Sequence, residues 1–144
     1  MQLGDLPRLS PLLSRSEGSA DYRFLFSRDQ HRRPLIEGHV EATLWQTCQR
    51  CLEEMQIAID SDFRLVVVQG LDEAGLLDEE FDPLLPAEHG VSLLDLVEDE
   101  LILSLPVVPL HEECKGIGHD DDMVTAGEPG ENPFAALKVL KESD

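Results

Sequence analysis

The clearest pattern in the sequence is a two-residue alternation of apolar and polar positions over 36–44. Its polar positions are filled by Glu37, His39, Glu41 and Thr43, and its other positions are small or apolar: Ile36, Gly38, Val40, Ala42 and Leu44. Successive side chains of a strand point to opposite faces of a sheet. The alternation therefore predicts a strand with one buried and one solvent-facing side.

A second alternation runs over 55–67, and Ser61 is its one interruption. The segment 48–51, Cys-Gln-Arg-Cys, separates the two runs. We therefore predict two antiparallel strands joined near the cysteine pair, with a candidate first strand at 21–26. Residues 1–19 contain two prolines and several Ser and Gly residues, so they predict an extended lead-in rather than a packed element. The acidic segment 70–90 predicts a loop that is partly mobile.

Residues 92–105 predict an amphipathic helix that begins at Ser92 as N-cap and ends before Pro106. At about 100° per residue, the apolar face comprises positions 93, 94, 97, 101 and 105, flanked by 96 and 103. Asp95, Glu98 and Asp99 point away from this face. Glu100 falls inside it, so its carboxylate either turns outward or needs a partner, for which Arg50 is the candidate.

These elements predict an α+β fold for a single domain spanning 1–144. The expected architecture is an antiparallel sheet or partial barrel with the helix of about 92–105 packed on it. A short C-terminal helix at 133–140 follows an acidic loop at 115–131. The longest apolar runs are far shorter than the roughly 20 residues that span a bilayer, and no secretory signal is visible. We therefore expect a cytoplasmic protein with reduced cysteines and no membrane partner.

Charge is distributed very unevenly along the chain, which has a formal net charge of -19. Residues 70–132 hold eighteen acids and a single base, whereas residues 1–69 hold ten acids and eight arginines. Such a chain repels phosphate, so the pattern favours a basic protein partner over RNA, with a merely solvated surface as the alternative. The candidate partner-binding residues are Asp95, Glu98, Asp99, Arg50, Glu100 and Phe134. A direct RNA contact would use Arg28, Arg32, Arg33 and Trp45, together with Arg50.

Two short motifs carry candidate metal chemistry. Cys48 and Cys51 form a C-x-x-C pair, and His111 and Cys114 form an H-x-x-C pair. Such spacings suit a tetrahedral zinc site. A redox pair and inert buried thiols are the alternatives, and the 59 residues between the pairs, 52–110, favour inert thiols. The sequence contains no nucleophile–base, paired-carboxylate or phosphate-loop pattern, so we expect neither an enzyme nor a cofactor, with zinc as the one alternative.

Three stretches together resemble the YceD-like family, the large ribosomal RNA subunit accumulation proteins. They are Cys48-Gln49-Arg50-Cys51-Leu52, the segment from Leu94 to His111 that runs into Leu-Pro-Val-Val-Pro, and Asn132-Pro133-Phe134-Ala135. The resemblance implies a non-catalytic role in the synthesis, processing or stability of 23S rRNA. It also implies a partner among large-subunit ribosomal proteins or assembly factors. Its cysteine-rich members have further cysteines after the motif that matches 114–116, where this chain has Ile-Gly-His.

Overall fold

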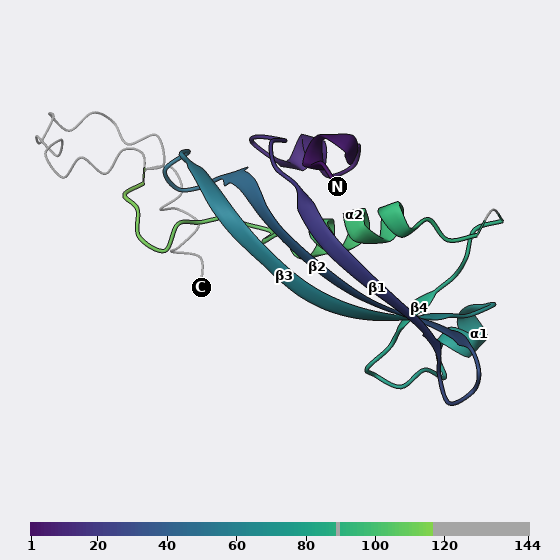
Figure 1. Ribbon diagram of the computed structural model, residues 1–144. Helices are drawn as coiled ribbons and strands as arrows, with labels where there is room; N and C mark the ends of the chain where they lie inside the picture. Colours follow the sequence, from purple (N-terminus) through teal and green to yellow (C-terminus); the bar gives the residue numbers. More distant parts are fainter. Residues whose placement is uncertain (89, 117–144) are drawn as a thin grey trace, which may run out of the picture.

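A computed structural model of the protein describes residues 1–88 and 90–116 (Figure 1). The predicted helix at 133–140, Phe134 and the loop beyond Gly116 lie outside these residues. The elements follow one another in the order η1 (Leu3–Asp5), η2 (Ser10–Leu12), β1 (Ala20–Arg28), β2 (Pro34–Thr47), β3 (Glu54–Val67), α1 (Leu71–Ala74), β4 (Asp82–Leu84) and α2 (Leu93–Leu103).

The four strands form one sheet in the order β1-β2-β3-β4, and α2 lies along one face of it (Figure 1). Strands β1, β2 and β3 pair antiparallel, as predicted, and the cysteine pair lies in the β2–β3 turn. The α+β fold class is confirmed. The sheet is not closed into a barrel, and the short β4 pairs parallel with Leu65–Val67, so the prediction of a purely antiparallel sheet is wrong at this edge.

The alternation along β2 determines which side chains form the core. All five predicted inward positions, from Ile36 to Leu44, are buried. Gly38 is required among them because the ring of Phe63 on β3 occupies the space where a Cβ atom would lie. This face is covered by α2 through Val97 and Leu101.

The first nineteen residues are packed rather than extended, so the prediction of an extended lead-in is wrong. Leu3, Leu6 and Leu9 are almost fully buried in the main core, where they join β2 and α2. Their spacing of three residues matches the short 3-10 turns of η1 and η2, in which residues i and i+3 share a side. The N-terminal segment therefore closes one end of the core.

The acidic segment 70–90 also contains more structure than predicted. It forms α1 and β4, and Leu77 and Phe81 pack on a second cluster made by Leu35, Val66 and Val68. Val66 points to the opposite face of β3 from Phe63, so this end of β3 has buried side chains on both faces, whereas Leu25 and Phe26 at the same end of β1 are exposed. The prediction of a loop holds only for the rest of this segment.

Helix α2 begins and ends close to the predicted positions. The Ser92 side chain accepts a hydrogen bond from the Asp95 amide, at 3.3 Å, which confirms the N-cap. The predicted apolar face is partly wrong, because Leu94 and Leu103 are exposed, whereas Glu98, which was predicted to point away from this face, is buried. Within residues 1–88 and 90–116, no helix has both the length and the apolar character needed to cross a bilayer.

Candidate functional site

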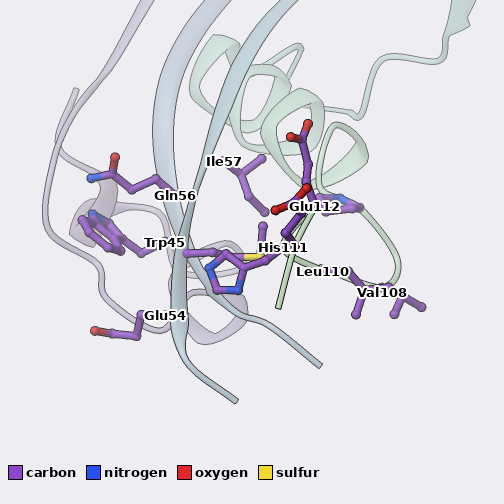
Figure 2. Close-up of a pocket in the computed structure, with 11 residues that line it drawn as sticks. Trp45, Glu54, Gln56, Ile57, Val108, Leu110, His111 and Glu112 are labelled. Carbon is purple, nitrogen blue, oxygen red and sulfur yellow. The ribbon is translucent and has the colours of Figure 1, made fainter. Parts of the chain in front are cut away.

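The chain that follows α2 runs back to the β2–β3 turn and lies beside it. The Gln49 amide donates a hydrogen bond to the Pro109 carbonyl, at 2.9 Å, which joins the two segments. Beside this contact lies a groove of about 1020 Å³, called the edge groove below (Figure 2). It is lined by Trp45, Glu54, Met55, Gln56, Ile57, Pro106, Val108, Leu110, His111, Glu112 and Glu113.

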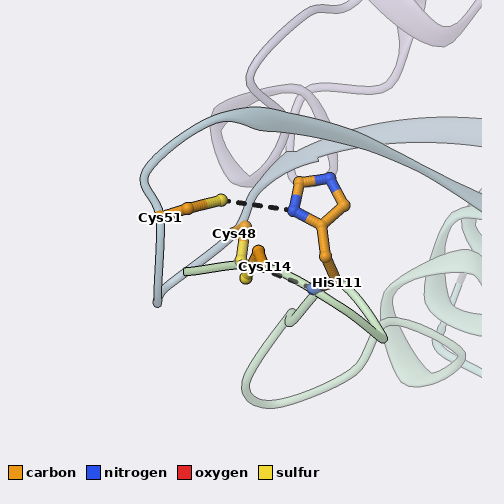
Figure 3. Close-up of side chains that lie close together, drawn as sticks. All are labelled: Cys48, Cys51, His111 and Cys114. Carbon is orange, nitrogen blue, oxygen red and sulfur yellow. Dashed lines mark hydrogen bonds between the residues drawn. The ribbon is translucent and has the colours of Figure 1, made fainter. Parts of the chain in front are cut away.

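The same contact brings together four potential metal ligands, called the Cys3His cluster below: Cys48, Cys51, His111 and Cys114. Their ligand atoms all lie within 4.8 Å of one another (Figure 3). The Sγ atoms of Cys48 and Cys114 are 3.8 Å apart, and Cys51 Sγ lies 3.3 Å from His111 Nδ1. A tetrahedral zinc ion with Zn–S bonds of about 2.3 Å separates two sulfur ligands by about 3.8 Å. The donor set and its spacing therefore fit zinc.

The backbone around Cys48 favours a negative charge on its sulfur. Although burial opposes ionisation, amide groups of Cys51, His111 and Arg50 surround this sulfur and lower the pKa of the Cys48 thiol well below its usual value. Burial raises the pKa of the Cys114 thiol, as does its closeness to Cys48 and Cys51. The cluster thus stabilises one thiolate readily but resists a second, and a divalent cation would relieve that repulsion.

All three cysteines are free thiols. The C-x-x-C and H-x-x-C pairs converge, which meets the geometric condition for a shared zinc site. Cys48 is buried and the other three cluster residues are half-buried, which leaves little of the cluster open to solvent. With four protein ligands, such a site is of the structural type that clamps segments together, rather than the catalytic type with an open position.

The predicted acidic face of α2 is wrong for Glu98. Its side chain is only 3% exposed, and its Oε1 accepts hydrogen bonds from the amides of Arg8 and Leu9 at 2.6 and 3.0 Å. The Arg8 guanidinium donates to Glu98 Oε2 and also pairs with Asp99. Burial alone would raise the pKa of Glu98, but these hydrogen bonds and the charge of Arg8 lower it. Of the three predicted acids, only Asp95 is exposed without a cationic side-chain partner among the described residues.

The predicted pair between Arg50 and Glu100 is also wrong. Ser61 Oγ donates to Glu100 Oε1 at 2.6 Å, whereas the Arg50 guanidinium lies 3.4 Å from the Cys114 carbonyl. Ser61 interrupts the apolar alternation of β3, and Glu100 interrupts the apolar face of α2. They interrupt them because they meet across the interface between β3 and α2.

The residues predicted for direct RNA contact do not converge. Arg28, Arg32 and Arg33 lie at the β1–β2 turn, while Trp45 lies at the opposite end of β2. Arg33 is held by Asp29, at 2.6 Å, and Trp45 is covered by the Arg15 guanidinium, 4.9 Å from its ring centre.

Sequence reasoning missed one polar cluster on the sheet face opposite α2. His39 forms hydrogen bonds with Glu41 and Asp62, both at 2.9 Å, and these interactions raise the pKa of His39. The alternation had placed His39 and Glu41 on this outer face. The strand register, which brings Asp62 opposite His39, was needed to complete the cluster.

The family model described as large ribosomal RNA subunit accumulation protein YceD matches residues 36–141. The Haemophilus influenzae protein with the same description is 32% identical over 143 residues, which cover 95% of this chain and 82% of that relative. No solved structure shows a significant match. The matched region includes β3, α2 and the whole Cys3His cluster.

Proposed function

This chain belongs to the YceD family of large ribosomal RNA subunit accumulation proteins, and from that membership we propose that it is a non-enzymatic ribosome-biogenesis factor. In this role it supports the synthesis, processing or stability of 23S rRNA in the cytoplasm. It acts by binding a basic protein, either a ribosomal protein of the large subunit or an assembly factor.

A protein partner is favoured over RNA because several arginines in the described part of the chain are already paired with carboxylates. Four of them, Arg8, Arg15, Arg33 and Arg64, already form ion pairs with carboxylates of the same chain. Each contact with an RNA phosphate needs a basic side chain that is not already paired. Few such side chains remain to offset the repulsion between RNA and a chain with a net charge of -19. For a basic protein partner, the same negative charge raises the association rate and favours the correct orientation of the two molecules.

We also propose that the Cys3His cluster binds a structural zinc ion. Cys48 and Cys51 would hold it from the β2–β3 turn, and His111 and Cys114 from the segment after α2. The metal would supply no catalysis. It would fix the segment 106–114 against the sheet, and thereby hold one wall of the edge groove in place.

Affinity purification from cells, with and without ribonuclease, tests the choice of partner. We expect a basic ribosomal protein or assembly factor to remain bound after ribonuclease treatment and to dissociate as salt is raised. Loss of every co-purifying protein after ribonuclease treatment, with rRNA crosslinked directly to this chain, would support the RNA-binding alternative instead.

A further inference from the structure

Within residues 1–88 and 90–116, strand β3 has a free edge along most of its length. Its residues from Glu54 onward pair with β2 on one side, whereas on the other side the part of the chain that the structure describes pairs with Leu65–Val67 alone, through the short β4. Among the described residues, no backbone hydrogen bond joins 54–64 to the segment 106–113 beside it. A free edge presents alternate N–H and C=O groups that can pair with a further strand.

The edge groove follows this free edge at the end near the Cys3His cluster. Trp45, Glu54 and Gln56 lie on one side of β3, and Ile57, Leu110 and Glu112 lie on the other (Figure 2). An added strand would therefore meet side chains on both of its faces. Because side chains alternate between faces, the specificity of such binding comes from the two walls.

The lining of the groove combines apolar and acidic groups. Val108, at 57% exposed, and Leu110, at 41%, offer uncovered apolar surface. Glu112 and Glu113 are exposed, and neither forms an ion pair within the described part of the chain. An occupant with both apolar and basic side chains would complement this lining.

A second copy of the chain fits this edge poorly. Antiparallel pairing of two β3 edges about Ser61 would bring the acidic side chains of Asp60 and Asp62 together, and like charges opposite one another are destabilising. The same charges favour a basic strand. These acidic side chains oppose self-association of the protein but leave the β3 edge available to a basic partner.

We propose that the edge groove binds an extended basic segment of the partner protein, which adds to the free edge of β3 as a further strand. This inference rests on the proposed function, since it specifies which part of a basic partner is recognised and where. The backbone of the segment pairs with β3, its apolar side chains contact Val108 and Leu110, and its basic side chains approach Glu112 and Glu113.

A synthetic peptide tests the inference with the full-length protein. The probe is a fluorescein-labelled nine-residue peptide in which lysine and valine alternate, and binding is measured by fluorescence anisotropy. Two further peptides have N-methyl groups on either the lysines or the valines, which removes the backbone donors from one edge only. We expect one N-methylated peptide to bind at least roughly tenfold more weakly than the parent, and the other to bind about as well.

A matched pair of variants tests the position of the site. Glu112→Gln with Glu113→Gln should weaken peptide binding roughly three- to tenfold, because two surface charge pairs are lost. Glu79→Gln with Glu88→Gln changes the charge equally outside the groove and should have little effect. Amide hydrogen exchange should slow in Glu54–Ile57 when the peptide is bound.

Several results would overturn the inference. They are failure of the parent peptide to bind, equal binding by both N-methylated peptides, or equal effects of the two double variants. Binding of a nine-nucleotide RNA in place of the peptide would also overturn it, as would a stable dimer that the peptide does not dissociate. If a basic protein still co-purifies after ribonuclease treatment, such results reject the groove and leave the proposed function standing.

Discussion

The contact between α2 and the N-terminal segment predicts a large effect of one substitution, Glu98→Ala. The Glu98 carboxylate receives the amides of Arg8 and Leu9 and the Arg8 guanidinium. Removing it leaves two amides without a partner beside the core, and a buried unpaired donor costs about 1–3 kcal/mol. The guanidinium is half-exposed and can return to water. We therefore expect a loss of about 3–4 kcal/mol in the free energy of unfolding, a large share of the roughly 5–15 kcal/mol typical of a domain.

Urea denaturation followed by far-ultraviolet circular dichroism and by the fluorescence of the single tryptophan measures this loss. Asp99→Asn is the matched control, since Asp99 pairs with the same arginine but is half-exposed, and its effect should be only a small fraction of that of Glu98→Ala. If the two variants differ by less than about 0.5 kcal/mol, the Glu98 carboxylate does not secure the N-terminal segment, and the reasoning fails.

The other predictions concern the metal, two polar contacts and acid stability. Elemental analysis of protein purified without a histidine tag should find about one zinc per chain, and chelation or Cys48→Ser should loosen the fold; protein that folds normally without zinc would contradict the site. Nuclear magnetic resonance titration should place the pKa of His39 above its ordinary value of about 6.5, and Asp62→Asn should lower it; an unchanged pKa would contradict the contact. Ser61→Ala should destabilise the wild type but have much less effect in a Glu100→Ala background, which lacks the acceptor, whereas additive losses in a double-mutant cycle would show that the two do not interact. Because the pKa of Glu98 is lowered on folding, its contribution to stability is present above pH ~4.3 and is lost as pH falls through the folded-state pKa. Glu98→Gln should therefore make the free energy of unfolding depend less on pH in the acid range. An unchanged pH dependence in that range would contradict the lowered pKa.

Periodicity identified β2, β3 and α2 because each has a strong repeat of its own. The N-terminal segment was misread for the opposite reason: Pro7 and Pro11 are typical of irregular chain, and nothing local reveals that its leucines have a core to enter. Likewise, β4 has only three residues, and its pairing with β3 depends on a tertiary contact. Short elements that are stabilised by packing leave little trace in the sequence.

The site was predictable in its ligands but not in its surroundings. The spacing of the C-x-x-C and H-x-x-C pairs predicted all four residues of the Cys3His cluster, but tertiary contacts such as the hydrogen bond between Gln49 and Pro109 bring the two pairs together. A helical projection of α2 places Glu98 on the polar side of the helix, because the projection considers the helix in isolation. It could not show that the N-terminal segment packs against that side.

The central claim is tested most directly by the ratio of mature 23S to 16S rRNA in cells that lack this protein. The account predicts a lower ratio in the deletion strain, restored by the wild-type gene, at both slow and fast growth. It further predicts that the Glu112→Gln, Glu113→Gln variant restores the ratio less well than the Glu79→Gln, Glu88→Gln control. An unchanged ratio in a clean deletion strain at both growth rates would contradict the account.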